Sequence, residues 1–195
     1  MTFMHLASAE REKSMNRLVV ISGCSSGGKS TLLSELKKRG YVVVPEVGRE
    51  IVKEQLTANS GITPWQKPTE FSELLISRSI EAYNAAKKIP IAKGHAIFFD
   101  RSFLEGVAYY QSLKIKDAHK YDLIVNELRF DPKIFMAPPW KELFCHDKER
   151  QHSFEEAVAE YNRLLEFYPQ QGYSIVEIPK ESIEKRIEWI LKQVF

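Results

Sequence analysis

Short, uninterrupted runs of apolar residues alternate along this chain with longer segments in which apolar residues recur every three or four positions. Runs of the first kind predict buried strands. They cover residues 18–21, 41–44, 96–99, 133–137 and 173–178. Strands that are apolar on both faces are typical of parallel sheets with helices on each side. The alternation therefore predicts an α/β fold, in which a parallel five-stranded sheet lies between two layers of helices.

The segments with helical spacing predict the two outer layers. In the first of them, Leu32, Leu33 and Leu36 share one face. Helices are expected over residues 29–39, 50–56 and 69–88, after Ser102, after Ser153 and over residues 183–194. At Ser102 and again at Ser153, a Glu follows three positions later, which is the pattern of a capping box at the start of a helix.

Composition and charge narrow the class of protein. The chain has 195 residues, of which 44% are apolar, and this is enough to form the core of one domain. We expect a flexible extension over residues 1–16 and a single domain over residues 17–195. The net charge of +2 is too small for a protein that binds duplex nucleic acid. No segment is long and apolar enough to span a bilayer, and no pattern sets the oligomeric state.

The two cysteines, Cys24 and Cys145, have no paired spacing. A disulfide at Cys24 would hold rigid a glycine-rich loop that has to wrap around a ligand. Both are therefore predicted to be thiols in a reducing compartment. The N-terminal residues also lack the apolar run of a secretory signal. Together these observations favour a cytoplasmic protein.

One glycine-rich motif predicts the chemistry. It runs Gly23-Cys24-Ser25-Ser26-Gly27-Gly28-Lys29-Ser30, after a strand and before an amphipathic helix. Glycine lets the backbone curl so that several N–H groups point at one phosphate, and the helix adds the positive end of its dipole. Lys29 is placed to reach the β- and γ-phosphates, Ser30 to bind Mg²⁺ and Thr31 to contact the α-phosphate. The motif predicts an ATP site, with GTP as the alternative nucleotide.

Charged residues follow the second and third strands where those strands end. In open α/β sheets, ligands bind beyond the carboxyl ends of the strands. Asp100 is therefore a candidate to hold Mg²⁺, and Arg101 either stabilises phosphoryl charge or pairs with a neighbouring carboxylate. Glu46 is a candidate general base or acceptor ligand, and the alternative is a surface turn residue. Arg49, one helical turn later, either binds a phosphate of the substrate or pairs with Glu46.

A segment of mixed charge and aromatic residues, 140–152, lies between the fourth strand and the next helix. Phosphotransferases often close such a segment over the nucleotide to exclude water. Arg150 is a candidate to contact phosphate from this lid, whereas Lys148 fits better as a solvent-exposed residue. His146 and His152 are not part of any metal-ligand pattern.

Several motifs, taken in order along the chain, resemble a known family. They are GCSSGGKST, PEVGRE, FFDRS, APPW followed by HDKER, and GYSIVEIP. Together they are similar to AAA-type ATPase-like P-loop domains related to nicotinamide-riboside kinases, as in bifunctional regulators of NAD biosynthesis, and more distantly to nucleoside and nucleotide kinases. The resemblance runs from Arg17 to the end of the chain. The segment Asp100-Arg101-Ser102 is closer to deoxynucleoside-type kinases.

The resemblance implies a three-layer P-loop fold of the nucleotide-kinase type. It implies that Glu46 and Arg49 face the acceptor, and that Asp100, with Arg101, lies beside Mg²⁺. It also implies that Arg150 belongs to the lid. Pro179 and Lys180 would then lie near the base of the nucleotide.

These observations predict an enzyme that uses Mg²⁺ and ATP to phosphorylate a small, nucleoside-like acceptor. Trp65, Tyr109 and Tyr110 are possible walls for the acceptor pocket. The alternative is a switch or ATPase that binds ATP or GTP and acts through a protein or lipid partner. Such a switch would need no enclosed acceptor pocket.

Overall fold

A computed structural model describes residues 16–25, 27–92, 95–115, 117–143 and 153–195. Its strands form one five-stranded sheet in the order β2-β3-β1-β4-β5, and every neighbouring pair is parallel. The strands are β1 (Arg17–Gly23), β2 (Val42–Val44), β3 (Ala96–Asp100), β4 (Lys133–Ala137) and β5 (Ser174–Glu177). The five parallel strands expected from the apolar runs are therefore confirmed. Because the strands are parallel, all their carboxyl ends meet at one edge of the sheet.

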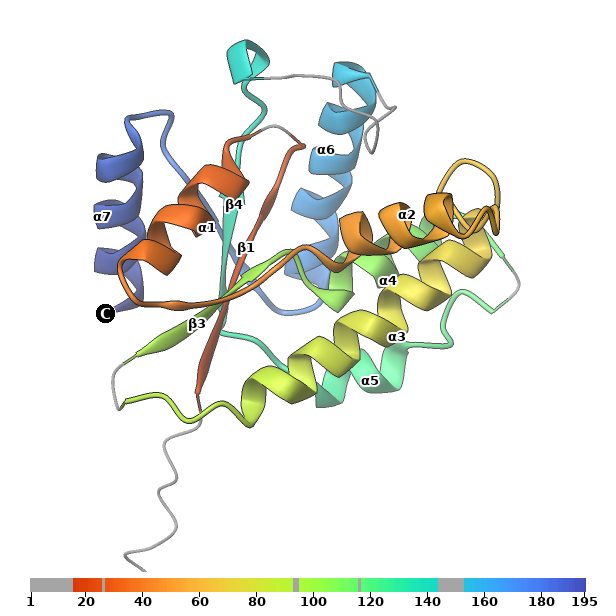
Figure 1. Ribbon diagram of the computed structural model, residues 1–195, viewed down its shortest axis with the longest axis horizontal. Coiled ribbons are helices and arrows are strands. Elements are labelled where there is room, and N and C mark those ends of the chain that lie inside the picture. The colour runs from red at the N-terminus through yellow and green to blue at the C-terminus, as the bar shows by residue number, and fades with distance from the viewer. Residues whose placement is uncertain (1–15, 26, 93–94, 116, 144–152) are drawn as a thin grey trace, which may run out of the picture.

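Helices cover both faces of this sheet. They are α1 (Lys29–Lys38), α2 (Val47–Thr57), α3 (Pro68–Lys87), α4 (Phe103–Ser112), α5 (Asp122–Glu127), the 3₁₀ helix η1 (Lys141–Leu143), α6 (Phe154–Gln170) and α7 (Ile183–Val194). In Figure 1, α1 and α7 lie on one side of the sheet, whereas α3, α4, α5 and α6 lie on the other. The prediction of three layers is thus confirmed.

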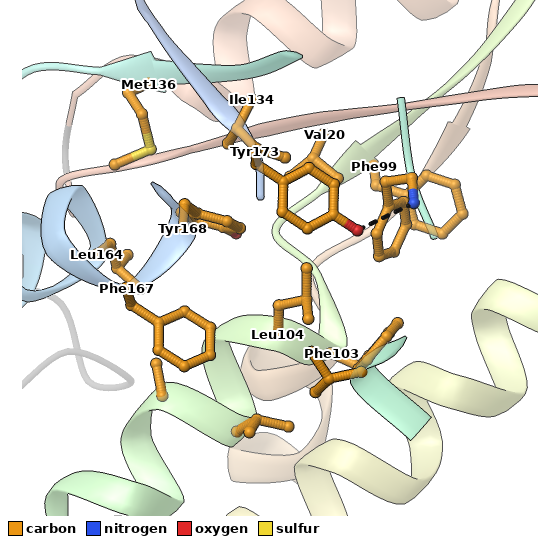
Figure 2. Packing of buried hydrophobic residues seen from close by; sticks show 14 of the residues in the cluster. Val20, Phe99, Phe103, Leu104, Ile134, Met136, Leu164, Phe167, Tyr168 and Tyr173 are labelled. Carbon is orange, nitrogen blue, oxygen red and sulfur yellow. Dashed lines mark hydrogen bonds between the residues drawn. The ribbon is translucent and has the colours of Figure 1, made fainter. Parts of the chain in front are cut away.

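The core divides between the two faces because successive residues of a strand point in opposite directions. Val19 and Ile21 of β1 pack with the leucines of α1 and the isoleucines of α7. Val20, between them in the chain, packs on the opposite face with α4 and α6. Figure 2 shows this second cluster, in which Leu104 of α4 and Tyr168 of α6 lie within the same group of buried side chains.

The structure corrects three local expectations. Helix α2 begins directly after Glu46, three residues before the expected start, and α5 was not predicted. The capping box expected at Ser102 is wrong, because the Ser102 side chain makes no capping hydrogen bond and instead shares one with the Tyr168 hydroxyl at 3.1 Å. The capping box at Ser153 is confirmed, since both reciprocal hydrogen bonds with Glu156 are present.

Residues 1–15 of the expected N-terminal extension lie outside the described residues. Within the part of the chain that the structure describes, no helix has the length and apolar character needed to cross a bilayer. The cytoplasmic location and the division into an extension and one domain stay predictions.

Helices α3 and α4 approach each other closely at Gly106. A Cβ atom added there would lie 2.9 Å from Ile76 Cγ1 and 3.3 Å from Leu75 Cγ. Both distances are shorter than ordinary contacts between carbon atoms. The missing side chain of Gly106 therefore sets the spacing between the two helices.

We expect Gly106→Val to lower the free energy of unfolding by about 1–3 kcal/mol, because the added methyl groups must displace the side chains of α3. Urea unfolding of the variant and the wild type measures the difference. The control is Ala85→Val, at an exposed position of α3, for which a loss below about 1 kcal/mol is expected. Equal losses in the two variants would contradict the close packing at Gly106.

Candidate active site

The glycine-rich loop connects the end of β1 to the start of α1 and turns back over the end of β4. Cys24 N donates to Ala137 O at 2.9 Å, and Gly27 N donates to Cys24 O at 3.1 Å. Gly23 has φ of 118°, and a Cβ atom there would lie 2.3 Å from Ala137 O. Only glycine fits this position. The turn brings the loop to the edge where the strands end, as its sequence predicts.

Lys29 lies inside this loop, and its side chain is almost fully buried. Its Nζ donates to Cys24 O at 2.9 Å and to Gly23 O at 3.4 Å. Burial lowers the pKa of Lys29, and the nearby charge of Arg101 acts in the same direction. An anion at the loop would favour the charged ammonium, so the site is arranged for a negatively charged ligand.

Ser30 and Thr31 stand at the exposed N-terminal end of α1. Ser30 lines a cavity of about 410 Å³ together with Asp100. The two residues expected to bind Mg²⁺ therefore share one cavity, although they are 70 positions apart in sequence. Ser25 is buried and lines a second, larger cavity. Ser26 lies outside the described residues, and Cys24 is a buried thiol.

Asp100 is the last residue of β3 and lies beside Ile21 of β1. Its Oδ1 is buried and has no hydrogen-bond partner among the described residues. Burial raises the pKa of Asp100 to about 6, and Glu46 adds to this increase, whereas Lys29 opposes it. A buried carboxylate oxygen without a partner fits Mg²⁺, a hard cation that prefers oxygen ligands.

Within the described ranges, no group of three or more His, Cys, Asp and Glu residues can hold a metal ion. The residues that fit Mg²⁺ are instead one hydroxyl, Ser30, and one carboxylate, Asp100. This small set matches the way Mg²⁺ is bound together with nucleotide phosphates, because the phosphates and water supply the remaining oxygen ligands.

Arg101 follows Asp100 in a left-handed backbone conformation, with φ of 67°. Its backbone N–H donates to Ile21 O at 3.1 Å, which fixes the turn out of β3. Such a conformation is uncommon for a residue with a side chain. It is a form of strain that concentrates at functional sites.

The guanidinium of Arg101 lies among three carboxylates from three different helical regions. Nε is 3.4 Å from Glu46 Oε1, Nη1 is 3.3 Å from Glu160 Oε1, and Nη1 also pairs with Glu105. Although burial acts to lower it, these carboxylates hold the pKa of Arg101 well above its ordinary value. Of the two roles considered for Arg101, carboxylate pairing is the one the structure shows.

Glu105 and Glu160 were not identified from the sequence as residues of the site. Glu105 is nearly fully buried and accepts a hydrogen bond from the Tyr168 hydroxyl at 3.0 Å. Its place in an apparent capping box pointed to a different role. Glu160 lies in the middle of α6, where nothing in the local pattern separates it from a solvent-exposed glutamate.

The larger cavity has a volume of about 810 Å³ and extends from the loop between α2, α3, α4 and α6. Its apolar wall includes Phe71, Leu75 and the predicted residues Trp65 and Tyr109. Tyr110, also predicted, does not line it, because this residue packs in the core against Tyr121 with ring centroids 5.1 Å apart. This volume falls within the range of about 300–1,000 Å³ that is typical of small-molecule sites in proteins.

Carboxylates outnumber guanidinium groups on the wall of this cavity. The charged side chains in its described lining are Glu46, Asp100, Glu105, Glu156 and Glu160 on one hand, and Arg49, Arg101 and Arg163 on the other. Pro45, Glu46, Arg49 and Asp100 line both cavities. Three of the four strand-end residues selected from the sequence, Glu46, Arg49 and Asp100, therefore lie where the two cavities adjoin, whereas Arg101 is in the lining of the larger cavity only.

Three further predictions are not tested or not supported by the lining of the two cavities. Arg150 lies outside the described residues, as does most of the expected lid; its first part, residues 140–143, includes η1. Pro179 and Lys180 follow β5 at the same edge of the sheet, but neither of the two cavities has them in its lining. Their role near a nucleotide base stays a prediction.

Comparison with known proteins identifies both a family and a fold. The sequence model described as "AAA domain" matches residues 18–186. A search of curated proteins found no match. Deoxyadenosine kinase from M. mycoides, with dCMP and dCDP bound, is similar in structure, with a TM-score of 0.65 and 18% identity over 91% of this chain and 98% of that one.

Thymidylate kinase from Candida albicans is also similar, with a TM-score of 0.63 and 17% identity over 92% of this chain and 91% of that one. At these identities the likeness establishes the fold alone. It confirms the P-loop fold of the nucleotide-kinase type. The relation to nicotinamide-riboside kinases stays a prediction.

Asp100 gives a pH-dependent prediction. Its pKa is about 6 in the folded protein against an ordinary 3.8, so the folded state binds this proton more tightly than the unfolded chain does. The free energy of unfolding therefore falls as pH rises through this range. We expect Asp100→Asn to raise the free energy of unfolding at pH 7.5 by roughly 1–3 kcal/mol, with a smaller gain at pH ~4.5.

The measurement is urea unfolding of both proteins at the two pH values, without nucleotide or Mg²⁺. Asp117→Asn serves as the control, because Asp117 is exposed, and its effect should be small and equal at both pH values. A stability gain in Asp100→Asn that did not grow with pH would refute the assignment of a buried, ionised carboxylate.

Proposed function

The chain belongs to the AAA domain family, and from this premise we propose that it is a kinase that transfers the γ-phosphoryl group of ATP to a hydroxyl of a small, nucleoside-like acceptor. Mg²⁺ assists the transfer. GTP is the alternative donor. The fold it shares with nucleoside and nucleotide kinases is compatible with this reaction.

One observation carries the proposal: the phosphate loop and the larger cavity meet at the same charged residues. Ser30 of the loop and Asp100 line the smaller cavity, and Asp100, Glu46 and Ser25 line the larger one. A kinase requires adjoining sites of this kind, because donor and acceptor must lie in contact for direct transfer. A switch that only hydrolyses nucleotide has no use for a cavity of about 810 Å³.

In the proposed mechanism the loop amides and the Lys29 ammonium hold the β- and γ-phosphates. Ser30 and Asp100 would hold Mg²⁺, which neutralises negative charge on the phosphate oxygens when it is bound. Glu46 accepts the proton of the acceptor hydroxyl as that oxygen bonds to the γ-phosphorus. The bond between the γ-phosphorus and its bridging oxygen breaks, and ADP leaves with that oxygen.

Arg101 has two functions in this scheme. Its guanidinium fixes the Glu46 carboxylate at 3.4 Å, so the base is held in one orientation. Its charge also lies close enough to Lys29 to lower the pKa of that residue, and in the proposed reaction it can stabilise negative charge that develops during transfer. Arg150 would add a further positive charge from the lid, and Arg49 remains a candidate to bind the acceptor.

The charge of the larger cavity favours an acceptor without a phosphate group. Among the described residues, five carboxylates and three guanidinium groups line it, and three of these carboxylates are already paired with Arg101. A monophosphate would meet like charges and would have to displace these ion pairs. The names of the two similar structures, deoxyadenosine kinase and thymidylate kinase, describe a nucleoside and a nucleotide acceptor respectively. The cavity charge favours the nucleoside.

We expect ATP consumption that depends on an added nucleoside and on Mg²⁺. The assay is a phosphoryl-transfer screen with ATP and GTP against nucleosides, including nicotinamide riboside, and against the matching monophosphates. Lys29→Ala should lower kcat/KM at least ~100-fold, because Lys29 contacts the transferred group. Lys38→Ala, at an exposed position of α1, is the matched control and should retain activity.

Tight ATP binding without turnover by any acceptor would overturn the kinase and favour the switch. Turnover of monophosphates but not of nucleosides would overturn the acceptor class while leaving the kinase intact. Activity that survived Lys29→Ala would mean that the loop does not hold the donor.

Glu46→Gln tests the base. We expect kcat to fall by about 10²–10⁴-fold, because glutamine cannot take the acceptor proton, while the affinity for ATP changes little. Steady-state kinetics and calorimetry with ATP measure the two effects separately. Glu70→Gln, at an exposed position of α3, is the control. A loss confined to KM would assign Glu46 to acceptor binding and exclude it as the base.

A further inference from the structure

Arg186 stands out among the charged residues that the proposed reaction does not use. It lies in the first turn of α7, and its side chain is among the largest that are fully buried, with 1% of its surface exposed. Among the described residues, no carboxylate lies within ion-pair distance of it, and its Nε has no hydrogen-bond partner. A buried charge without a counter-ion costs several kcal/mol. Burial correspondingly lowers the pKa of Arg186.

The guanidinium of Arg186 lies against the phosphate loop, and Arg186 is in the lining of neither cavity. Its Nη2 donates to Gly27 O at 2.9 Å, and its Nη1 is 2.7 Å from the point where a Cβ atom on Gly28 would lie. On another side the guanidinium faces the ring of Trp140, with 5.5 Å to the ring centroid. Arg186 thus contacts both the loop and the residue that precedes η1.

The hydrogen bond to Gly27 O fixes the orientation of one peptide group. In a trans peptide, the carbonyl of Gly27 and the N–H of Gly28 point in opposite directions. Since the Gly27 carbonyl points toward Arg186, which lines neither cavity, the Gly28 N–H is turned away from Arg186. That is the orientation in which a loop amide can donate to a phosphate oxygen.

We propose that Arg186 is a positioning residue for the nucleotide polyphosphate: it holds the Gly27–Gly28 peptide in its binding orientation, and its uncompensated charge is balanced by the phosphates once they bind. The inference rests on the nucleotide-binding part of the proposed function and does not depend on the acceptor.

A purely structural role predicts a different behaviour. If Arg186 served only to fill space, a methionine of similar length would serve equally well, and replacing a buried charge with an apolar side chain is often neutral or stabilising. The proposal therefore predicts a separation between two measurements. Arg186→Met should leave the free energy of unfolding of the ligand-free protein unchanged or higher, yet weaken the binding of ATP.

The experiment measures the dissociation constants of MgATP, inorganic tripolyphosphate and adenosine by calorimetry. In Arg186→Met we expect about 10–100-fold weaker binding of MgATP and of tripolyphosphate, as for a lost hydrogen bond involving a charged group. Adenosine, which has no phosphate, should bind as it does to the wild type. Lys192→Met, at an exposed position of the same helix, is the matched control and should change none of these values.

Arg186→Lys provides a second test that keeps the positive charge but loses the planar guanidinium. We expect it to recover part of the polyphosphate affinity lost in Arg186→Met, because it supplies the counter-ion without the fixed geometry. Should Arg186→Met fail to fold, weaker tripolyphosphate binding by Arg186→Lys at unchanged thermal stability would still support the proposal.

Three results would overturn the proposal. One is wild-type affinity for ATP in Arg186→Met. Another is a loss of affinity that is equal for adenosine and tripolyphosphate. The third is the absence of ATP and tripolyphosphate binding by the wild type, which would also refute the proposed function. Tight ATP binding by the wild type without any acceptor turnover would refute the kinase and leave the role of Arg186 intact.

Discussion

The site depends on one electrostatic arrangement, the Arg101 guanidinium held by Glu46, Glu105 and Glu160. These carboxylates come from the start of α2, from α4 and from α6, so one side chain joins three elements around the end of β3. Ion pairs on a protein surface are weak and mobile, and they would not hold a guanidinium and three carboxylates at fixed distances. Here Arg101 is largely buried, and the surrounding helices fix its partners.

The arrangement is costly, and the rest of the fold offsets its cost. Arg101 has a left-handed backbone, and the pKa of the neighbouring Asp100 is raised to about 6 by burial and by the nearby carboxylates. A hydrogen bond from the buried Tyr168 hydroxyl orients Glu105. The aromatic and aliphatic core between α4, α6 and the sheet, seen in Figure 2, supplies the stability against which this strain can persist.

Features of the structure that depend on residues close together in the chain could be predicted from the sequence. The strands, the phosphate loop and the strand-end residues Glu46 and Asp100 could be predicted, because apolar runs, glycine spacing and parallel topology decide them. The rest depends on distant partners. Ser102 was expected to cap its helix, but its hydroxyl instead forms a hydrogen bond with the hydroxyl of Tyr168, 66 residues further along the chain. In the same way, Glu160 meets Arg101 across 59 positions, and Arg186 meets Gly27 across 159.

Charge is distributed unequally between the phosphate loop and the larger cavity, and in the proposed function this difference would orient the two substrates. At the loop, the buried cations Lys29 and Arg186 both donate to backbone carbonyls, and among the described residues no carboxylate lies within ion-pair distance of Arg186. In the larger cavity, carboxylates exceed guanidinium groups. In the proposed reaction, a polyphosphate would therefore be attracted to the loop and repelled from the cavity, whereas a neutral hydroxyl compound would meet no such repulsion in the cavity. Charge would then separate the two proposed substrates before their bases are contacted, and would leave the γ-phosphate at the boundary between loop and cavity, beside Asp100 and Glu46.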